Sequence, residues 1–280
     1  MAGYWGEFVG VDFAGGGAEW GGLVAVRKSN LQYKKDTKTW SFMENQYDIV
    51  ETLNQNVGTD YASQNIVSLF GWGTSGKTIS NYGSAYQPYA TSTTSTAYGP
   101  SGNYNLTDAY VNGDWGVNMG TGWRTLTSAE WEYLFNTRSA STVNGTANAR
   151  YAKAKVNNVY GVILFPDAYT HPSGVTDPVG INATDAAGWN GNTYDAMAWS
   201  KMETAGCVFL PAAGFRDEAE VEYAGSDGYY WSSSHRVSDP PFESDTEFAY
   251  NMYFGSWSMN PTGYDHRYRG YSVRLVRDAN

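Results

Sequence analysis

Residues 122–134 read GWRTLTSAEWEYL, and this stretch carries the strongest local structural signal in the chain. Thr127 and Glu130 fit a capping box, in which the threonine hydroxyl and the glutamate carboxylate satisfy backbone N–H groups at the start of a helix. Trp131 and Leu134 then follow at helical spacing on one side. The stretch therefore predicts a short helix that buries a tryptophan against a sheet.

The rest of the chain predicts many short strands and one further helix. Glycine accounts for 32 of the 280 residues, and turn-forming residues recur along almost the whole sequence. A second helix is expected over Ala196–Ala205, because Gly206 suits the left-handed cap that ends a helix. Strands are expected at Leu31–Tyr33, Trp40–Phe42, Gly161–Phe165, Cys207–Leu210, Phe248–Phe254 and Ser272–Val276. In the last of these, alternation places Val273 and Leu275 on one face. The expected class is α+β, with short antiparallel strands, two or so short helices and long ordered loops.

Composition and charge exclude several kinds of function. The chain has 18 Lys and Arg residues against 28 Asp and Glu residues, a net charge of -10. This balance argues against binding to nucleic acid or to an anionic membrane, where a basic face supplies the affinity. Cys207 is the only cysteine, so neither an intrachain disulfide nor a cysteine-based zinc site is expected. No apolar run approaches the ~18 residues of a membrane-spanning helix, so we expect no direct membrane insertion.

The chain reads as one main domain. Residues 1–22 show no secretory signal pattern, and we interpret them as a lead segment or linker before a single domain over residues 23–280. The stretch Thr78–Thr107 has no charged residue and allows two interpretations, disorder or an ordered loop. Its tyrosines supply apolar surface that true linkers lack, which favours the ordered loop.

Candidate catalytic and metal-binding residues are scattered. The three histidines, His171, His235 and His266, form no recognised metal motif. A glycosidase carboxylate pair stays open as an alternative, although solvated charge is the simpler interpretation of its candidates, Glu130, Glu132, Asp217 and Glu220. Four acids could hold a structural calcium ion but lack the spacing of a known calcium loop; they are Asp217, Glu218, Glu220 and Glu222. We expect no catalytic residue and no cofactor, and the metal content stays unknown.

The C-terminal region, residues 227–271, has the composition of a binding site. Tyrosine and tryptophan alternate there with Ser, Asn, Asp, Gly and Thr. The large rings give rigid contact area at low entropic cost, and the small polar residues give adaptable hydrogen bonds. Core packing is the alternative for some of these rings. It is expected for Trp231, Tyr250 and Phe254, whereas Tyr264, Asp265 and His266 are expected on exposed loops.

Several segments in this order resemble one large bacterial group. Residues 122–134 resemble its W-R-x-L-T-x-x-E-W segment. Further matches follow along residues 23–280; they are NLQY (30–33), LFGWGTSG (69–76), DWG (114–116), FLPAAGFR (209–216), YWSSS (230–234) and GYSVRLVR (270–277). The chain is thereby similar to proteins with the C-type-lectin-like fold of the formylglycine-generating-enzyme type, including the Fibrobacter major paralogous domain group. The resemblance implies that fold for residues 23–280.

The ending of the chain resembles the variable proteins of diversity-generating retroelements from gut bacteria and their phages. In these, a reverse transcriptase copies a template with errors at adenines into the 3′ end of the gene. Changes at the two adenines of an Asn codon can give codons for Tyr, Asp, His, Ser, Gly and Thr but not for Trp. Trp257 therefore departs from the pattern. The implied ligand-binding, variable residues are Tyr229, His235, Arg236, Tyr253, Gly255, Trp257, Thr262, Tyr264, Asp265, His266, Tyr268 and Tyr271. The implied scaffold residues are Trp123, Trp131, Leu210, Trp231, Phe254, Val273 and Leu275.

The family's enzymes hold copper with two cysteines or iron with three histidines and an added helical bundle, and this chain departs from both patterns. The resemblance therefore implies a non-enzymatic, receptor-recognition protein on a cell surface or phage particle. Its expected partner is a protein or glycan ligand on another cell or host, with no nucleic acid. Two alternatives remain: a carbohydrate-active enzyme or glycan-binding surface protein, and a structural, fimbria-like subunit.

Overall fold

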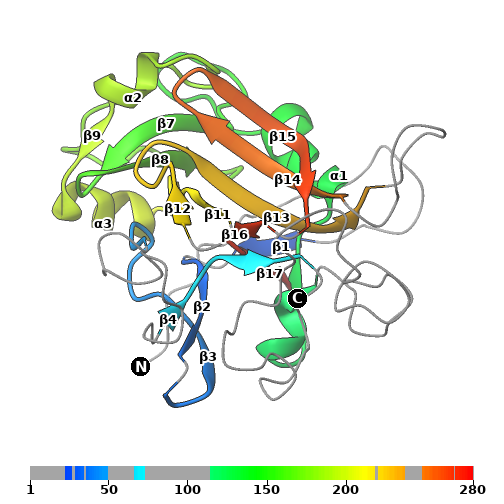
Figure 1. Ribbon diagram of the computed structural model, residues 1–280. Helices are drawn as coiled ribbons and strands as arrows, with labels where there is room; N and C mark the ends of the chain where they lie inside the picture. Colours follow the sequence, from blue (N-terminus) through cyan, green and yellow to red (C-terminus); the bar gives the residue numbers. More distant parts are fainter. Residues whose placement is uncertain are drawn as a thin grey trace.

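The computed structural model describes residues 23–26, 29–34, 36–49, 66–72, 114–217, 220–236, 248–267 and 269–279. Within these ranges the chain forms five small sheets and a few short helices (Figure 1), which confirms the α+β class. The expectations for residues 1–22, for Thr78–Thr107, for Glu218 and for Tyr268 lie outside the described residues.

In each of the five sheets of the described residues, neighbouring strands are hydrogen-bonded to each other. The sheets are β1-β17-β6 (Leu23–Val26, Leu275–Ala279, Trp123–Thr125); β10-β8-β7-β9 (Val208–Pro211, Val159–Leu164, Tyr151–Val156, Thr193–Tyr194); β12-β11-β16-β5 (Glu220–Glu222, Phe215–Asp217, Gly270–Tyr271, Phe70–Gly71); β13-β14-β15 (Gly228–His235, Phe248–Gly255, Ser258–His266); and β3-β2-β4 (Thr39–Phe42, Leu31–Lys34, Ile66–Val67). The helices are the 3-10 helix η3 (Trp115–Asn118), α1 (Ser128–Glu132), the π-helix η4 (Tyr133–Thr137), α2 (Ala187–Gly191) and α3 (Ala196–Thr204).

The sheet β10-β8-β7-β9 is buried on both faces. Along β8, Val162 and Leu164 belong to a core shared with α1 and with the sheet β13-β14-β15. The intervening Ile163 belongs to a second core, which contains Trp199 and Met202 of α3. A strand covered on both sides reads as a continuous apolar run rather than an alternating one, which explains the sequence VILF at 162–165.

Tryptophans join the C-terminal strands to the rest of the fold. Trp231 of β13 is fully buried in a third core with Val273 and Leu275. Its indole N–H donates to the carbonyl of Phe70 at 2.6 Å, and the Trp72 indole donates to the carbonyl of the next residue along β13 at 2.8 Å. These bonds tie β13 to segments about 160 residues away in sequence, so this strand is held in place from outside its own sheet.

Arg138 closes the helical segment that follows the capping box. Arg138 directly follows η4, and its N–H donates to the carbonyl of Tyr133, five residues earlier, at 3.0 Å. Its side chain lies in the interior. The fully buried guanidinium donates to Asp167 at 2.5 Å and to the carbonyls of Leu134, Arg150 and Phe165. Burial lowers the pKa of Arg138, an effect that the Asp167 carboxylate opposes. This one side chain therefore joins the end of η4 to the segments around Arg150 and Phe165 through buried carbonyls.

Most of the local predictions are confirmed. The capping box at Thr127 is present in both directions, and α3 ends one residue earlier than expected, before Gly206 at φ +94°. The last strand differs: the extended run is divided into β16 and β17, and residues 272–274 between them form no regular strand. The expected scaffold residues are fully buried except for Trp123, which is half-buried against the third core. They are Trp131, Leu210, Trp231, Phe254, Val273 and Leu275.

Two tryptophans of the C-terminal sheet provide a matched test of this core. Trp231 is 0% exposed and Trp257 is 77% exposed. We expect Trp231→Ala to lower the free energy of unfolding by about 3–5 kcal/mol, because it leaves a large cavity. Trp257→Ala should change it by about 0.5 kcal/mol or less. Urea denaturation followed by circular dichroism measures both, and equal losses in the two variants would contradict this account of the core.

Candidate functional site

The sheet β13-β14-β15 separates a buried face from an open one. Along β14, Met252 and Phe254 point into the first core, whereas Asn251 and Tyr253 lie on the opposite face, as the alternation of a strand requires. Asn251 pairs with Gly263, but Tyr253 pairs with Asn260. The extra residue on β15 forms a bulge, which locally bends a strand and redirects its side chains.

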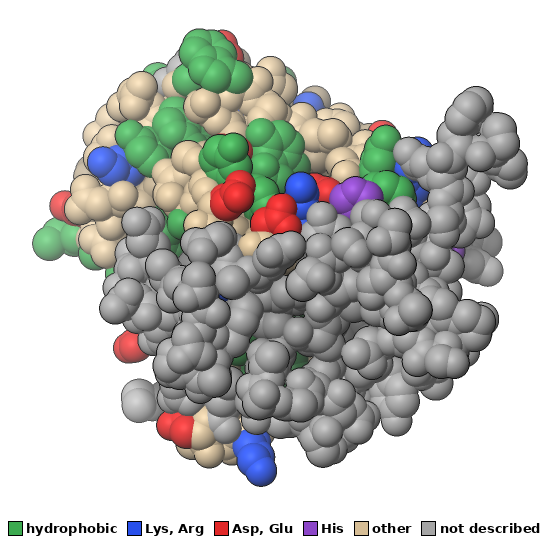
Figure 2. Space-filling model, viewed as in Figure 1, with side chains coloured by type: hydrophobic (Ala, Val, Ile, Leu, Met, Phe, Trp, Pro, Cys, Tyr) green, Lys and Arg blue, Asp and Glu red, His purple; other side chains and the backbone are tan. Residues whose placement is uncertain are grey.

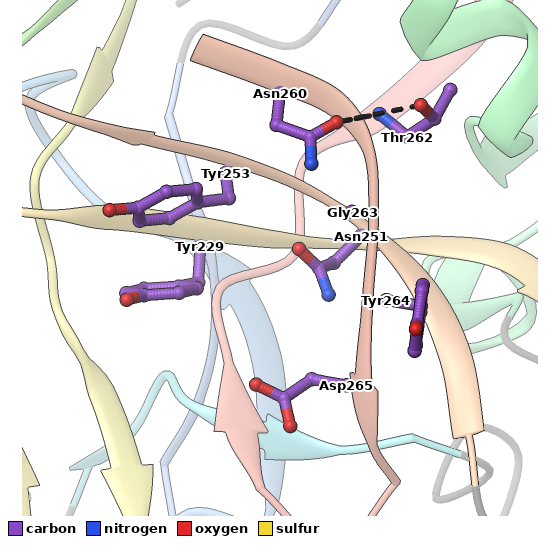
Figure 3. Close-up of a pocket in the computed structure, with 8 residues that line it drawn as sticks. All are labelled: Tyr229, Asn251, Tyr253, Asn260, Thr262, Gly263, Tyr264 and Asp265. Carbon is purple, nitrogen blue, oxygen red and sulfur yellow. Dashed lines mark hydrogen bonds between the residues drawn. The ribbon is translucent and has the colours of Figure 1, made fainter. Parts of the chain in front are cut away.

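A hollow of about 260 Å³ opens on this second face (Figure 3). It is lined from all three strands by Tyr229, Asn251, Tyr253, Asn260, Thr262, Gly263, Tyr264 and Asp265. Figure 3 shows the rings of Tyr229 and Tyr253 side by side, with Asn251 at the centre and Tyr264 on the opposite side. The hollow therefore presents aromatic rings at its sides and amide groups between them.

The tyrosines at one side continue into the core as a stack. The ring of Tyr229 lies 4.7 Å from that of Tyr253 and 4.9 Å from that of Tyr271, and the Tyr271 ring stacks on Trp231 at 4.2 Å. Tyr253 is half-buried and donates its hydroxyl to Asp227 at 3.5 Å. Because the inner end of the stack is fixed by a fully buried tryptophan, the outer rings are held in place before any ligand binds.

Asp265 lines the hollow but is already bonded on its inner side. Its Oδ2 atom accepts from the Tyr271 hydroxyl at 2.5 Å and from Arg269 at 2.7 Å, and Oδ1 accepts from the N–H of His266 at 2.7 Å. Arg269 also pairs with Asp217 at 3.5 Å. The Asp265 carboxylate is thus compensated and held by groups of the scaffold.

The two ends of the sheet carry different groups. At one end, the guanidinium of Arg236 lies 3.7 Å from the centre of the Tyr264 ring, and Phe248 contacts the rings of both Tyr264 and His266. A cation over an aromatic face is an attractive arrangement. Figure 2 shows acidic, basic and histidine side chains near hydrophobic ones on the face that it draws. The charge on that face is mixed rather than of a single sign.

At the other end, Lys153 of β7 fixes the hairpin between β14 and β15. This lysine is 1% exposed, and its ammonium donates to the carbonyls of Gly255 at 2.7 Å, Ser256 at 3.0 Å and Thr184 at 2.6 Å. Burial lowers its pKa to about 8. All three donors of the ammonium are used, so the hairpin tip that exposes Trp257 is anchored to the central sheet.

The structure brings part of the set of residues predicted to bind ligand into one hollow. Five of them line the hollow: Tyr229, Tyr253, Thr262, Tyr264 and Asp265. His235, Arg236 and His266 lie at the end of the sheet, and Trp257 lies at the hairpin tip. Tyr268, which belongs to the same predicted set, lies outside the described residues.

Two predicted surface residues are buried, and for these the expectation of exposure is wrong. Tyr271 is 0% exposed, because β16 is enclosed by β11 and β5 and the ring stacks on Trp231. Gly255 is buried beneath the hairpin, where an added Cβ would lie 2.9 Å from Asp227. Both residues belong to the frame that supports the hollow.

Asn251 and Asn260 line the hollow and were absent from the predicted set. Two signals in the sequence could have found them. Asn251 is two residues from Tyr253 and therefore shares its face in a strand. In the retroelement resemblance, moreover, asparagine is the residue from which the variable tyrosines arise, so an unaltered asparagine belongs among the candidates.

Among the candidate catalytic carboxylates whose side chains the structure describes, Glu130, Glu132 and Asp217, none lines the hollow. Glu130 is 4% exposed, not solvated as expected, because it completes the capping box and pairs with Arg124 at 2.7 Å. His171 lies elsewhere, bonded to the Tyr169 hydroxyl at 2.9 Å. Among the described residues, no group of three or more His, Cys, Asp or Glu side chains is arranged to hold a metal ion.

Comparisons with known proteins add no relative to this description. No protein-family model matches the chain, and neither the curated proteins nor the solved structures contain a significant match. Among the described residues, none of the helices is long and apolar enough to span a membrane.

The buried phenol of Tyr271 predicts a loss of stability in alkali. Burial, with help from Asp265, raises the pKa of Tyr271 well above its ordinary value of 10.0. The folded state then holds this proton more tightly than the unfolded state, so the stabilisation is present below about pH 10 and is lost as the pH rises above it. Tyr271→Phe should cost about 1–2 kcal/mol at neutral pH and should make the alkaline decline shallower.

Urea denaturation at several pH values between about 8 and 11 measures this decline. Met197→Ala, which removes a side chain 73% exposed on α3, is the control and should keep the wild-type dependence. An identical alkaline slope in wild type and Tyr271→Phe would show that the Tyr271 phenol does not carry the effect.

Proposed function

We propose that this protein is a non-enzymatic ligand-binding protein with a C-type-lectin-like fold of the formylglycine-generating-enzyme type, whose C-terminal surface is diversified by a retroelement. The ligand in this proposal is a protein or glycan on another cell, met at a bacterial surface or phage particle. One observation carries the proposal: residues of the predicted variable set line a single hollow on a sheet whose other face is core.

On β15 and the hairpin tip before it, exposed side chains stand on an anchored backbone, and this arrangement supports the proposed function. Thr262 is exposed, Tyr264 is 47% exposed and Trp257 is 77% exposed, so these side chains can change without disturbing the interior. The backbone beneath them is held by Lys153 and by the stack that ends on Trp231. A rigid backbone under changeable side chains limits the entropy lost on binding.

The chemistry of the hollow favours binding over catalysis. A carboxyl group acts as a general acid or base only when it is free to exchange a proton with the substrate. Asp265, the one carboxylate among the described residues of the lining, already accepts from Tyr271 and Arg269. The remaining polar groups of the described lining are amides and hydroxyls, which donate and accept hydrogen bonds to a ligand.

A genomic test addresses the diversification directly. The proposal expects a repeat close to the gene that matches its 3′ coding end and differs from it chiefly at adenines, together with a reverse transcriptase gene. Sequencing the surrounding genome of the source organism gives the answer. A neighbourhood without either element would reject diversification by a retroelement.

A stability test addresses the separation of variable and frame residues. We expect Thr262→Asn and Tyr264→Asn to change the free energy of unfolding by about 0.5 kcal/mol or less, since both side chains are exposed. Tyr271→Asn should cost about 3 kcal/mol or more, because it leaves a cavity beside Trp231. Thermal and urea denaturation of the three variants decide this, and comparable losses at Thr262 or Tyr264 would contradict a tolerant surface.

A further inference from the structure

Asn251 is a buried polar side chain directed into the hollow. It is 3% exposed, and its amide makes no hydrogen bond to any other residue in the part of the chain that the structure describes. Figure 3 shows the amide between Tyr229 and Tyr264, with Gly263 beside it. Neither of its amide atoms belongs to the fully buried side-chain atoms that lack a partner, so the amide reaches the open hollow. An amide offers both donors and an acceptor, so this position is suited to a ligand that supplies both a donor and an acceptor.

Gly263 and Asn260 leave space and a further donor next to that amide. A Cβ placed at Gly263 would lie 2.9 Å from the Asn251 Oδ1 atom and 3.5 Å from the Asn260 Nδ2 atom. The side-chain amide oxygen of Asn260, Oδ1, is already engaged, because it accepts from the backbone N–H of Thr262 at 3.1 Å. Its NH₂ group remains as a donor. The missing side chain of Gly263 therefore keeps open a space that two amides border.

The charges around the hollow favour an uncharged ligand. No Lys, Arg or His is among the described residues that line it, and the two arginines beside it are engaged, Arg236 over the Tyr264 ring and Arg269 with Asp265. The single acidic side chain, Asp265, is paired with Arg269 at 2.7 Å, which removes most of its attraction for a cation. One face of the Tyr264 ring already carries the guanidinium of Arg236 at 3.7 Å. An aromatic cage for a cationic ligand would need that face free.

The size and the aromatic rings limit the ligand further. At about 260 Å³, the hollow is smaller than the ~300–1,000 Å³ typical of sites for drug-sized molecules. Tyr229, Tyr253 and Tyr264 offer apolar ring surface that carries a polar tip. A pyranose ring matches this combination, because it joins an apolar C–H face to adjacent hydroxyls that each donate and accept.

We propose that the hollow binds one neutral pyranose ring, the terminal residue of a glycan, with the Asn251 and Asn260 amides bonded to its hydroxyls and its C–H face on the tyrosines. This inference rests on the proposed function and names the ligand class of the same site. A single ring makes few contacts, so its dissociation constant is expected on the order of 1 mM.

Saturation-transfer NMR of the full chain tests the inference. The probes are the methyl glycosides of glucose, galactose, mannose, fucose, N-acetylglucosamine and N-acetylgalactosamine, with choline and N-acetylneuraminic acid as charged comparisons. At least one neutral glycoside should bind in the millimolar range, and more tightly than either charged probe. Binding of none of the neutral glycosides, or tighter binding of a charged probe, would overturn the inference.

Two substitutions locate the binding. Asn251→Ala removes the central amide, and Gly263→Ala fills the space beside it; both should weaken binding of the neutral glycoside by about tenfold or more. Met197→Ala, at an exposed site on α3, should leave it unchanged. Circular dichroism and urea denaturation of each variant verify folding. Wild-type affinity in both Asn251→Ala and Gly263→Ala would place any sugar elsewhere and reject the site.

The outcome separates this inference from the proposed function. A chain that carries the adenine-directed repeat in its genome but binds no neutral glycoside still has a diversified binding surface, for a ligand of another class. A chain that binds a pyranose at Asn251 without such a repeat is a sugar-binding protein with a fixed site.

Discussion

The alternation of side chains along β14 is the constraint on which the C-terminal region depends. Met252 and Phe254 must stay in the core shared with the central sheet, and this requirement fixes Asn251 and Tyr253 on the opposite face. A slip of one residue in the pairing would reverse both sets. Two features help to fix this register. The Trp231 indole of β13 donates a hydrogen bond to the carbonyl of Phe70. On the other side of β14, the bulge in β15 sets the position at which the pairing shifts by one residue.

Anchoring of the backbone separates residues that can vary from residues that cannot. Within the described chain, buried carbonyls receive hydrogen bonds from side chains of the frame, such as Arg138, Lys153 and Trp231. The exposed side chains of Trp257 and Tyr264 make no such bond. Replacing an exposed ring therefore removes contact area without leaving a buried backbone group unsatisfied, which is the more costly loss.

Local sequence signals predicted much of the fold but only part of the site. The capping box at Thr127 and the cap at Gly206 involve neighbours within a few residues, so the pattern is sufficient. The burial of Tyr271 depends on β5 and β11, which are distant in sequence, and composition cannot distinguish a stacked tyrosine from an exposed one. Asn251 escaped prediction for a related reason: its significance comes from cross-strand neighbours such as Gly263.

The distribution of charge completes the argument. The chain carries a net charge of -10, yet four of its arginines are fully buried, Arg138, Arg216, Arg267 and Arg274. Two of these donate to backbone carbonyls: Arg274 donates to the carbonyl of Phe209 at 2.8 Å, and Arg138 donates to the carbonyls of Leu134, Arg150 and Phe165. A fold rich in loops needs such interior donors, because its backbone carbonyls exceed what short strands can pair. These four cations lie in the interior, whereas the described lining of the hollow consists mainly of amides, hydroxyls and aromatic rings. Exchange of these groups at the surface leaves the buried frame unchanged, so in the proposed function recognition and folding are carried by different residues.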